Sequence, residues 1–369
     1  MTTHHLLARS GTSTPSNSSN HNVPQAGNER GRKESTRGQR WIGAVQDQWV
    51  MYSDRPSDYT LHVPIGFGAS STVYLSSYHP ASSTSTGTST STSTSTIATS
   101  SSSSSSSGAS SAPAPLDCAI KVINLDTLPP SSLTLLTRET RLMSLSKHPN
   151  VLRVRGSWVQ GARLYIAMRL MRKGSVADLL AYAHQGGMPE EVCRCILRQA
   201  LEGLNYLHTN GFIHRDVKAA NLLIDDDGTV LLGDLGVAVS VLDDGGKHLG
   251  RRRSFVGTPS WMAPEVVRRL DYDSAADIWS FGILCLEITR GRAPYSREPP
   301  SKILLHTLSS PPPTLDLTGG VHPYSQSFAD IVSSCLQKDP SSRPTAAQLL
   351  ERPFFRNAKK KGYLVSSVL

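Results

Sequence analysis

A low-complexity tract of serine and threonine most constrains how this chain can fold. It runs from Ser82 to Ser111 and includes an alternating Ser-Thr stretch and a run of eight serines. Alternating threonine could favour a strand, but the tract has no apolar face, so burial cannot offset the entropy lost on ordering. We therefore expect residues 82–111 to be a disordered insertion in a hairpin loop, between strands at Val73–Tyr78 and Cys118–Ile123.

The composition indicates a packed domain together with low-complexity sequence. Of the 369 residues, 38% are hydrophobic, and removing the polar tail and the insertion leaves one unit of ordinary catalytic-domain size. The formal net charge of +9 is concentrated in residues 1–46 and 351–362, so we expect no nucleic-acid partner. No apolar run approaches the length of a membrane span or signal sequence, which predicts no membrane contact and a cytoplasmic protein.

The cysteines also favour a cytoplasmic location. Five are present and none forms a C-x-x-C pair, so we expect neither a zinc site nor a disulfide framework. An odd count fits a reducing cytosol. They are Cys118, Cys193, Cys195, Cys285 and Cys335.

Three motifs follow one another in the second half of the chain. Residues 214–221 read His-Arg-Asp-Val-Lys-Ala-Ala-Asn; Asp234-Leu235-Gly236 begins thirteen residues after Asn221, and Ala263-Pro264-Glu265 follows. Each motif alone could be a capped surface turn, but in this order and spacing the set resembles the protein kinases. The resemblance implies an α+β bilobal protein kinase fold, with a small β-rich N-lobe and a larger, mainly helical C-lobe. It also implies transfer of the γ-phosphoryl group of ATP to a hydroxyl.

Phosphoryl transfer needs positioned groups and cations that hold the charge on the phosphate oxygens. The resemblance implies that Asp216 accepts or orients the proton of the substrate hydroxyl and that Lys218 reaches the transferring phosphate. Asn221 and Asp234 offer hard oxygen atoms and are the implied Mg²⁺ ligands. A lysine two residues after the aspartate is typical of serine/threonine kinases.

A glycine loop lies upstream, where a kinase would need it. Residues 65–73 read as a strand, a tight turn and a second strand, in which Gly66 and Gly68 let the backbone approach phosphates. Ser71 replaces the third glycine of the usual G-x-G-x-x-G. A lone G-x-G is often only a hairpin turn, so its place in the order of motifs carries the interpretation.

Lys121 lies in the short apolar strand Cys118–Val122. A lysine in a buried strand is costly unless its charge is paired. Its expected partners are the α- and β-phosphates of ATP and Glu139, on the helix that follows. The alternative is that Glu139 is an ordinary solvated side chain.

Apolar residues of both lobes form the implied adenine slot. Ile65, Val73 and Ala119 would lie above the base, and Leu223 below it. Met168 fits the gatekeeper position, the backbone of Arg169 and Met171 would bond the adenine, and Asp178 would reach the ribose. Plain core packing explains the apolar members equally well, since such a slot is continuous with the core.

The second half of the chain reads as helical. Pro189 can open a helix, Glu190 and Glu191 suit its first turn, and Asn210-Gly211 ends it. The inward face of this helix is expected to carry Ile196, Ala200, Leu204 and Leu207. The resemblance implies that Asp277 anchors the catalytic loop, although this residue could also cap a helix. It also implies that Arg343 pairs with Glu265.

Two further stretches narrow the resemblance to a subfamily. Residues 255–265 look like the sterile-twenty group, and residues 336–340 and 353–361 resemble its oxidative-stress-responsive, Fray-type germinal-centre kinases. The resemblance covers about Tyr59 to Leu364, without the insertion. Leu235 stands where most kinases have Phe, and Ser260 where the subfamily usually has Cys. Relatives often carry a C-terminal domain that recognises peptide motifs, and this sequence ends before one.

These observations predict a polar, basic and flexible tail at residues 1–57, a kinase domain at 58–364 interrupted by the insertion, and a C-terminal end at 365–369. Within the tail, Trp41-Ile42 and Trp49–Tyr52 are apolar exceptions. We expect them to pack onto the small lobe; the alternative is a short docking motif.

The sequence therefore predicts a serine/threonine kinase that uses ATP and Mg²⁺, acts on protein substrates and belongs to a stress or osmotic signalling pathway. A pseudokinase or scaffold is the alternative, but Lys121, Glu139, Asp216, Asn221 and Asp234 are all present. The expected activating site is Ser254, phosphorylated by an upstream kinase and paired with Arg215 and with Arg251–Arg253. Thr258 competes as the site, but its hydroxyl is expected to bond Asp216 and Lys218. Residues 251–253 could instead be a solvated basic loop. The sequence does not indicate an oligomeric state.

Overall fold

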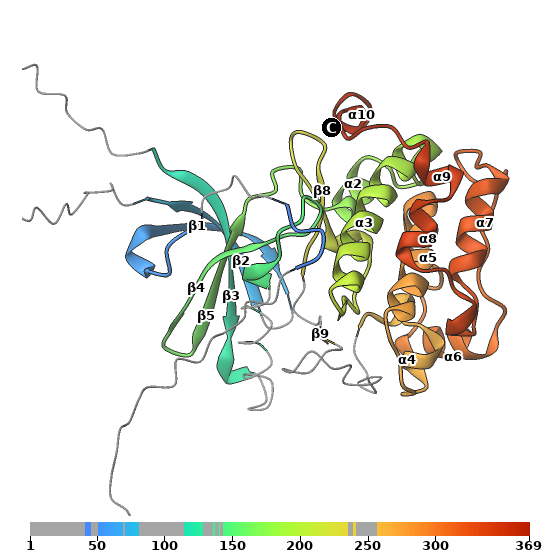
Figure 1. The fold of residues 1–369 in the computed structure, drawn as a ribbon, viewed down its shortest axis with the longest axis horizontal. Helices are drawn as coiled ribbons and strands as arrows, with labels where there is room; N and C mark the ends of the chain where they lie inside the picture. The colour runs from blue at the N-terminus through green and yellow to red at the C-terminus, as the bar shows by residue number, and fades with distance from the viewer. Residues whose placement is uncertain are drawn as a thin grey trace, which may run out of the picture. The chain divides into compact units, whose positions relative to one another are not determined.

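The computed structural model describes residues 41–45, 51–68, 71–80, 114–127, 136, 140, 143–234, 239–240 and 257–369. At 239–240 the description covers the backbone alone. Within these ranges a five-stranded sheet is followed by a group of helices, and Figure 1 shows the sheet on one side of the helices. The predicted α+β bilobal architecture is confirmed.

The sheet is antiparallel throughout. Its spatial order is β1-β2-β3-β5-β4, so neighbouring hairpins build it with one exchange between β4 and β5. The strands are β1 (Tyr59–Phe67), β2 (Ser71–Tyr78), β3 (Leu116–Asn124), β4 (Val154–Gln160) and β5 (Arg163–Arg169). The expected strand-turn-strand at 65–73 corresponds to the end of β1 and the start of β2.

The β2–β3 pairing shows where the low-complexity tract belongs. Tyr78 at the end of β2 lies opposite Leu116 at the start of β3. The tract thus connects two adjacent strands of one hairpin, as predicted. Its expected disorder concerns residues 82–111, which lie outside the described residues.

Helices make up most of the chain after β5. They are α2 (Val176–Tyr182), α3 (Glu190–Thr209), α4 (Pro264–Val267), α5 (Ala275–Arg290), α6 (Pro300–Ser309), α7 (Gln326–Cys335), α8 (Ala346–Leu350), α9 (Pro353–Arg356) and α10 (Gly362–Ser367). Nearly every residue of α5 is buried, as expected for a helix that is apolar on all sides. This helix is therefore the centre of the helical core.

Helix α3 matches the sequence prediction closely. It begins after Pro189, carries Glu190 and Glu191 in its first turn, and ends at Asn210. Gly211 follows with φ of 76°, a left-handed conformation that glycine adopts without steric cost. The four residues predicted to face inward are all buried: Ile196, Ala200, Leu204 and Leu207.

Two small ladders follow α3 and precede α4 in the sequence. β6 (Phe212–Ile213) pairs with β9 (Val239–Ser240), and β7 (Leu222–Ile224) pairs with β8 (Val230–Leu232). These ladders fix both ends of the loop at residues 214–221. They also bring the segment that follows Asp234 next to the start of that loop.

Two stretches of the N-terminal region contact the core in different places. Tyr52 packs on the sheet, where its ring centroid lies 4.7 Å from that of Tyr78, and the predicted small-lobe packing is confirmed there. Trp41 instead stacks on Tyr206 and Phe212 and joins the helical core. The prediction of small-lobe packing is therefore wrong for Trp41, because a broad aromatic surface is available where α3 ends and β6 begins.

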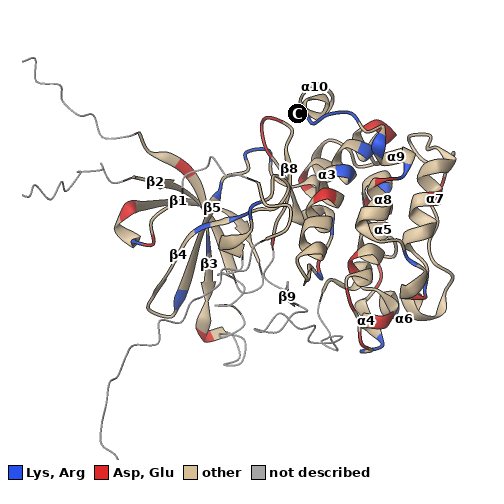
Figure 2. Cartoon of the chain, viewed as in Figure 1, with Lys and Arg blue, Asp and Glu red and all other residues tan. Residues whose placement is uncertain are grey.

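All five cysteines are buried and free. Figure 2 shows basic and acidic residues interspersed along the sheet and the helices, and several form ion pairs, such as Arg194 with Glu190. Among the described helices, none is long and apolar enough to cross a membrane.

Candidate active site

A buried carboxylate anchors the loop at residues 214–221. Asp277, in the first turn of α5, accepts hydrogen bonds from the backbone N–H groups of His214 (2.8 Å) and Arg215 (2.7 Å). His208 lies 2.8 Å from the same carboxylate. Burial opposes ionisation, but these hydrogen bonds hold the pKa of Asp277 below its usual value. Ser274 is the N-cap of α5, so Asp277 is the loop anchor and not a helix cap.

A compact hydrogen-bond network surrounds Asp216. Lys218 Nζ donates to Asp216 Oδ2 and to Thr258 Oγ1, both at 2.7 Å, and the Thr258 hydroxyl donates to Asp216 Oδ1 at 2.7 Å. The predicted bonding of Thr258 to both residues is confirmed. The network joins the loop to the segment that carries Thr258 and fixes the direction of the Asp216 carboxylate.

Asn221 and Asp234 are brought together by the backbone. Gly233 N–H donates to the carbonyl of Asn221 at 2.8 Å, which places the next residue, Asp234, beside the loop. The Asn221 amide nitrogen donates to the Asp216 carbonyl and carboxylate, at 2.7 and 3.0 Å. Its Oδ1 therefore remains available, since no described residue donates to it. An amide oxygen beside a carboxylate is the kind of donor set that Mg²⁺ shares with nucleotide phosphates, so these residues fit the metal.

Lys121 on β3 reaches directly to Asp234. The Lys121 Nζ donates to Asp234 Oδ1 at 2.5 Å, and the Asp234 side chain remains 46% exposed. Partial burial opposes ionisation, but the nearby ammonium holds the pKa of Asp234 below its usual value. The sequence did not suggest this contact. Its expected partner, Glu139, lies outside the described residues.

Two residues at the site have an unusual backbone. Arg215 has φ of 71° and Asp234 φ of 51°, both in the left-handed region that non-glycine residues seldom adopt. Such conformations persist only where the surroundings enforce them, and they concentrate at functional sites. At Arg215 the bonds to Asp277 supply that constraint.

The glycine loop forms the tight turn that its sequence predicts. Gly68 N–H donates to the Ser71 carbonyl at 2.7 Å, closing the turn between β1 and β2. A Cβ added to Gly68 would lie 2.9 Å from Ser71 Oγ, so a side chain there would require the Ser71 hydroxyl to move. Gly66 pairs with Val73 across the hairpin. A Cβ added to Gly66 would meet Val73 only at ordinary contact distance, so the close approach is confined to Gly68.

The predicted adenine-slot residues lie on adjoining elements. Ala119 on β3 is opposite Met168 on β5, which places both on the inner strands of the sheet. Met168, Met171 and Leu223 belong to one apolar cluster, and Ser175 bridges to Leu223 just beyond β5. The lower and rear parts of the slot are therefore contiguous.

The upper part of the slot is more open. Ile65 on β1 is 49% exposed and Val73 on β2 is half-buried. An exposed isoleucine at this position offers apolar surface to a ligand.

Asp178 and the side chain of Arg169 have structural partners. Asp178 Oδ2 accepts from Ser175 N–H (2.8 Å) and from the Ser175 hydroxyl (2.7 Å), in a capping box that starts α2. The Arg169 guanidinium pairs with Asp225. The carboxylate of Asp178 is exposed, so contact with a ribose stays a prediction.

Two buried glutamates support the site from the helical core. Arg343 donates to both oxygens of Glu265, at 2.6 and 2.8 Å, as expected. Glu287 on α5 was not anticipated: its Oε2 accepts from Ala219 N–H (2.9 Å) and Trp261 Nε1 (3.0 Å). A single acidic residue within the apolar stretch 278–288 was the available sequence signal.

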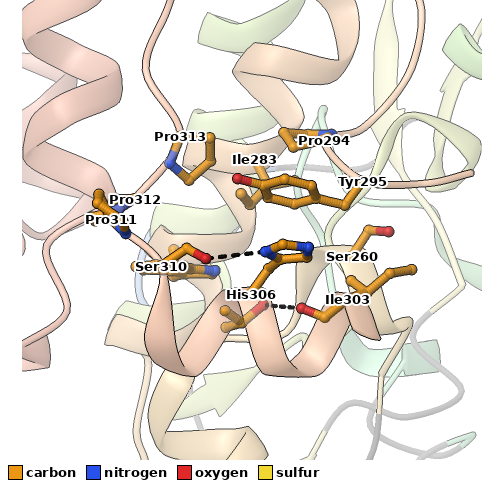
Figure 3. Close-up of a pocket in the computed structure, with 12 residues that line it drawn as sticks. Ser260, Ile283, Pro294, Tyr295, Ile303, His306, Ser310, Pro311, Pro312 and Pro313 are labelled. Atoms are coloured by element: carbon orange, nitrogen blue, oxygen red, sulfur yellow. Dashed lines mark hydrogen bonds between the residues drawn. The ribbon is translucent and has the colours of Figure 1, made fainter. Parts of the chain in front are cut away.

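A pocket with no part in this network lies beside the short 3₁₀ helix η5 (Pro259–Trp261) (Figure 3). His306 stacks on Tyr295 with ring centroids 4.4 Å apart and shares a 3.0 Å hydrogen bond with Ser310. Ser260 also lines it. None of the predicted catalytic or nucleotide-binding residues lies along its wall, so we assign it no role in the chemistry.

Comparison with known proteins agrees with this geometry. A family model described as "Protein kinase domain" matches residues 104–355, more than half of the chain. The matched range contains the 214–221 loop, Asp234 and Glu265.

The relatives that this chain matches are named as kinases, several of them as serine/threonine-protein kinases. The serine/threonine-protein kinase fray2 of Dictyostelium discoideum is 45% identical over 68% of this chain and 24% of its own length. Germinal center kinase 3 of Caenorhabditis elegans is 39% identical over 88% of this chain and 51% of its own length. The serine/threonine-protein kinase hippo of Drosophila melanogaster is 38% identical over 67% of this chain and 35% of its own length. The chain thus aligns with about half or less of each of these relatives.

Proposed function

The chain belongs to the protein kinase family, among relatives of the Fray and germinal-centre type, and from that premise we propose that it is an active serine/threonine kinase. It transfers the γ-phosphoryl group of ATP to serine or threonine hydroxyls of protein substrates. The observation that carries the proposal is the network of Asp216, Lys218 and Thr258, with Asn221 and Asp234 beside it. Phosphoryl transfer depends mainly on positioning and charge, which such a network supplies.

Each residue of the network has a distinct role in this proposal. Asp216 receives a hydrogen bond from the hydroxyl of the substrate and orients its oxygen toward the γ-phosphate. Lys218, held between Asp216 and Thr258, places a positive charge next to the transferring group. Thr258 forms part of the platform on which the acceptor residue rests.

Nucleotide binding uses the sheet and the segment that follows it. Gly66 and Gly68 bring backbone N–H groups toward the phosphates, and Lys121 offers its ammonium to the α- and β-phosphates. Asn221 and Asp234 would hold Mg²⁺, which would neutralise charge on the phosphate oxygens. The remaining proposed contacts are the adenine-slot residues Ile65, Val73, Ala119, Met168, Arg169, Met171 and Leu223, together with Asp178 at the ribose.

The proposed kinase domain spans residues 58–364, and the protein is proposed to act in the cytoplasm. The likeness to Fray-type kinases motivates a role in stress or osmotic signalling. Comparing the phosphoproteins of cells that carry the wild type or Asp216→Asn, before and after osmotic shock, tests this role. Equal phosphorylation under both conditions argues against it.

For regulation, we keep Ser254 as the proposed activating site, although it lies outside the described residues. The bonding of Thr258 to Asp216 and Lys218 supports this choice, because it gives Thr258 a different task. A phosphate at Ser254 would pair with Arg215 and the neighbouring arginines. Mass mapping of active enzyme and kinetics of Ser254→Ala test it. Full activity without any phosphate between residues 237 and 260 would refute it.

The direct test of the function is transfer of labelled phosphate from ATP to a generic basic protein. The competing function is that of a pseudokinase that binds partners without catalysis. Such proteins tend to lose the strand lysine or one of the two aspartates, whereas Lys121, Asp216 and Asp234 are present and in contact with partners here.

A further inference from the structure

Residues 41–45 make more contacts than a terminal tail usually does. The Trp41 ring stacks on Tyr206 and on Phe212, with centroids 5.5 and 5.0 Å apart and interplanar angles of 16° and 7°. Tyr206 is on α3, and Phe212 is the first residue of β6. Stacked aromatic pairs contribute more than the apolar area that they bury. Trp41 thus packs where the helix passes into the strand that leads to the catalytic loop.

A second contact fixes the position of this segment. Ile42 N–H donates to Asn210 Oδ1 at 2.8 Å, and Asn210 Nδ2 donates to the Ile42 carbonyl at 3.0 Å. Asn210 is buried and is the C-cap residue of α3. Its amide therefore binds the backbone of residue 42 as a neighbouring strand would. Such a reciprocal pair specifies register, which hydrophobic contact alone does not.

The same segment reaches the turn before β4. Val45 N–H donates to the Lys147 carbonyl at 3.0 Å, and Lys147 N–H donates to the Tyr206 hydroxyl at 3.0 Å. His148 stacks on the Tyr206 ring, which also contacts Trp41, and the centroids of His148 and Tyr206 lie 4.8 Å apart. Residues 41–45, α3 and the turn are therefore mutually connected.

These contacts lead to the proposed catalytic residues by a short path. Phe212 is followed by Ile213 and then by the loop that contains Asp216. Phe212 also pairs with Ser240 on β9, in the segment after Asp234. A displacement of β6 would therefore move both the loop that contains Asp216 and the segment that contains β9.

We propose that residues 41–45 are a positioning element for the phosphoryl transfer proposed above, with Trp41 as its central side chain. The inference rests on that proposed function. Trp41 does not touch the reacting groups; it holds β6, and through it the Asp216 loop, in place. Its loss should lower kcat while changing KM for ATP little, because most of the proposed ATP contacts come from β1, β2, β3 and residues 168–171, outside β6.

The test compares four variants in the full chain. Trp41→Ala and Trp41→Leu should lower kcat by about tenfold, with KM for ATP within about twofold of wild type. Trp41→Phe should keep most activity, because it retains an aromatic ring that can stack, and the ring N–H that it loses has no partner among the described residues. Ile42→Ala is the matched control: its side chain is 63% exposed, and Asn210 contacts only its backbone.

Hydrogen exchange supplies a readout independent of activity. Amides of residues 210–216 should exchange faster in Trp41→Ala and Trp41→Leu than in Trp41→Phe, Ile42→Ala or wild type. Wild-type kcat in both Trp41→Ala and Trp41→Leu would overturn the proposal, as would equal losses in Ile42→Ala. If Trp41→Ala does not fold, Trp41→Leu, which keeps apolar bulk, decides alone. If the wild type itself transfers no phosphate, the proposed function fails, and exchange still shows whether Trp41 anchors β6.

Discussion

At the scale of single residues, two buried carboxylates on α5 show how strongly the hydrogen-bond partners of a side chain affect its pKa. Asp277 accepts from His208 and two backbone N–H groups through both oxygens, and its pKa is lowered. Glu287 is also buried, but both of its donors, Ala219 and Trp261, bond one oxygen. There burial outweighs the hydrogen bonds and raises the pKa to about 7. Asp277 therefore stays charged at neutral pH, whereas Glu287 titrates.

This raised pKa predicts a pH-dependent stability. The pKa of Glu287 is about 7 in the folded protein against 4.5 for the ordinary carboxyl group. The contribution of Glu287 to the free energy of unfolding is fully present below pH 4.5 and is lost as the pH rises through 7. Glu287→Gln keeps an acceptor oxygen without the charge, so it should gain stability relative to wild type between pH 5.5 and 8. The gain should be on the order of 2–3 kcal/mol.

Urea unfolding of both proteins at several pH values measures this difference. Glu351→Gln, at an exposed carboxylate, is the control and should follow the wild type. Parallel pH profiles for wild type and Glu287→Gln would show that Glu287 has an ordinary pKa.

At the scale of elements, the sequence specified the secondary structure better than the contacts between elements. The G-x-G turn, the apolar strand around Lys121 and the amphipathic helix before the catalytic loop were all predictable, because each depends on local periodicity. The pairing of Lys121 with Asp234 was not, since it joins residues 113 positions apart. Trp41 was placed on the wrong lobe for the same reason: an isolated aromatic residue carries no information about which surface it covers.

The Arg343–Glu265 pair joins α4 to the 3₁₀ helix η6 (Pro340–Ser342) within the helical core. The Arg343 side chain is fully buried and also donates to three backbone carbonyls. Arg343→Ala leaves the Glu265 charge buried without its partner, which should cost about 3–5 kcal/mol. Thermal or urea unfolding measures the loss.

A matched control comes from the same residue type. Arg292→Ala removes an exposed arginine and should change stability by less than about 0.5 kcal/mol. Equal, small effects of both substitutions would show that the Arg343 pair does not stabilise the core.

At the scale of the whole molecule, one hairpin accommodates the low-complexity tract. The pairing of Tyr78 with Leu116 closes the hairpin independently of what connects the strands. Deleting residues 82–111 should therefore change activity and melting temperature little, because loop-closure entropy varies slowly with length. Scanning calorimetry and the transfer assay measure this. A melting temperature lowered by many degrees would mean that the tract is packed against the domain.

The central claim is that the loop at 214–221, Asp234 and Lys121 together form a working phosphoryl-transfer site. The most direct measurement is transfer of labelled γ-phosphate from ATP with Mg²⁺ to a protein substrate, comparing wild type, Asp234→Ala, Lys121→Met and Asp226→Ala. Asp226 is an exposed aspartate of the β7–β8 turn and serves as the control. We predict phosphoserine or phosphothreonine from wild type and Asp226→Ala, and background incorporation from folded Asp234→Ala and Lys121→Met. Wild-type protein that binds ATP without transferring phosphate, or near wild-type turnover in either site variant, would contradict the account.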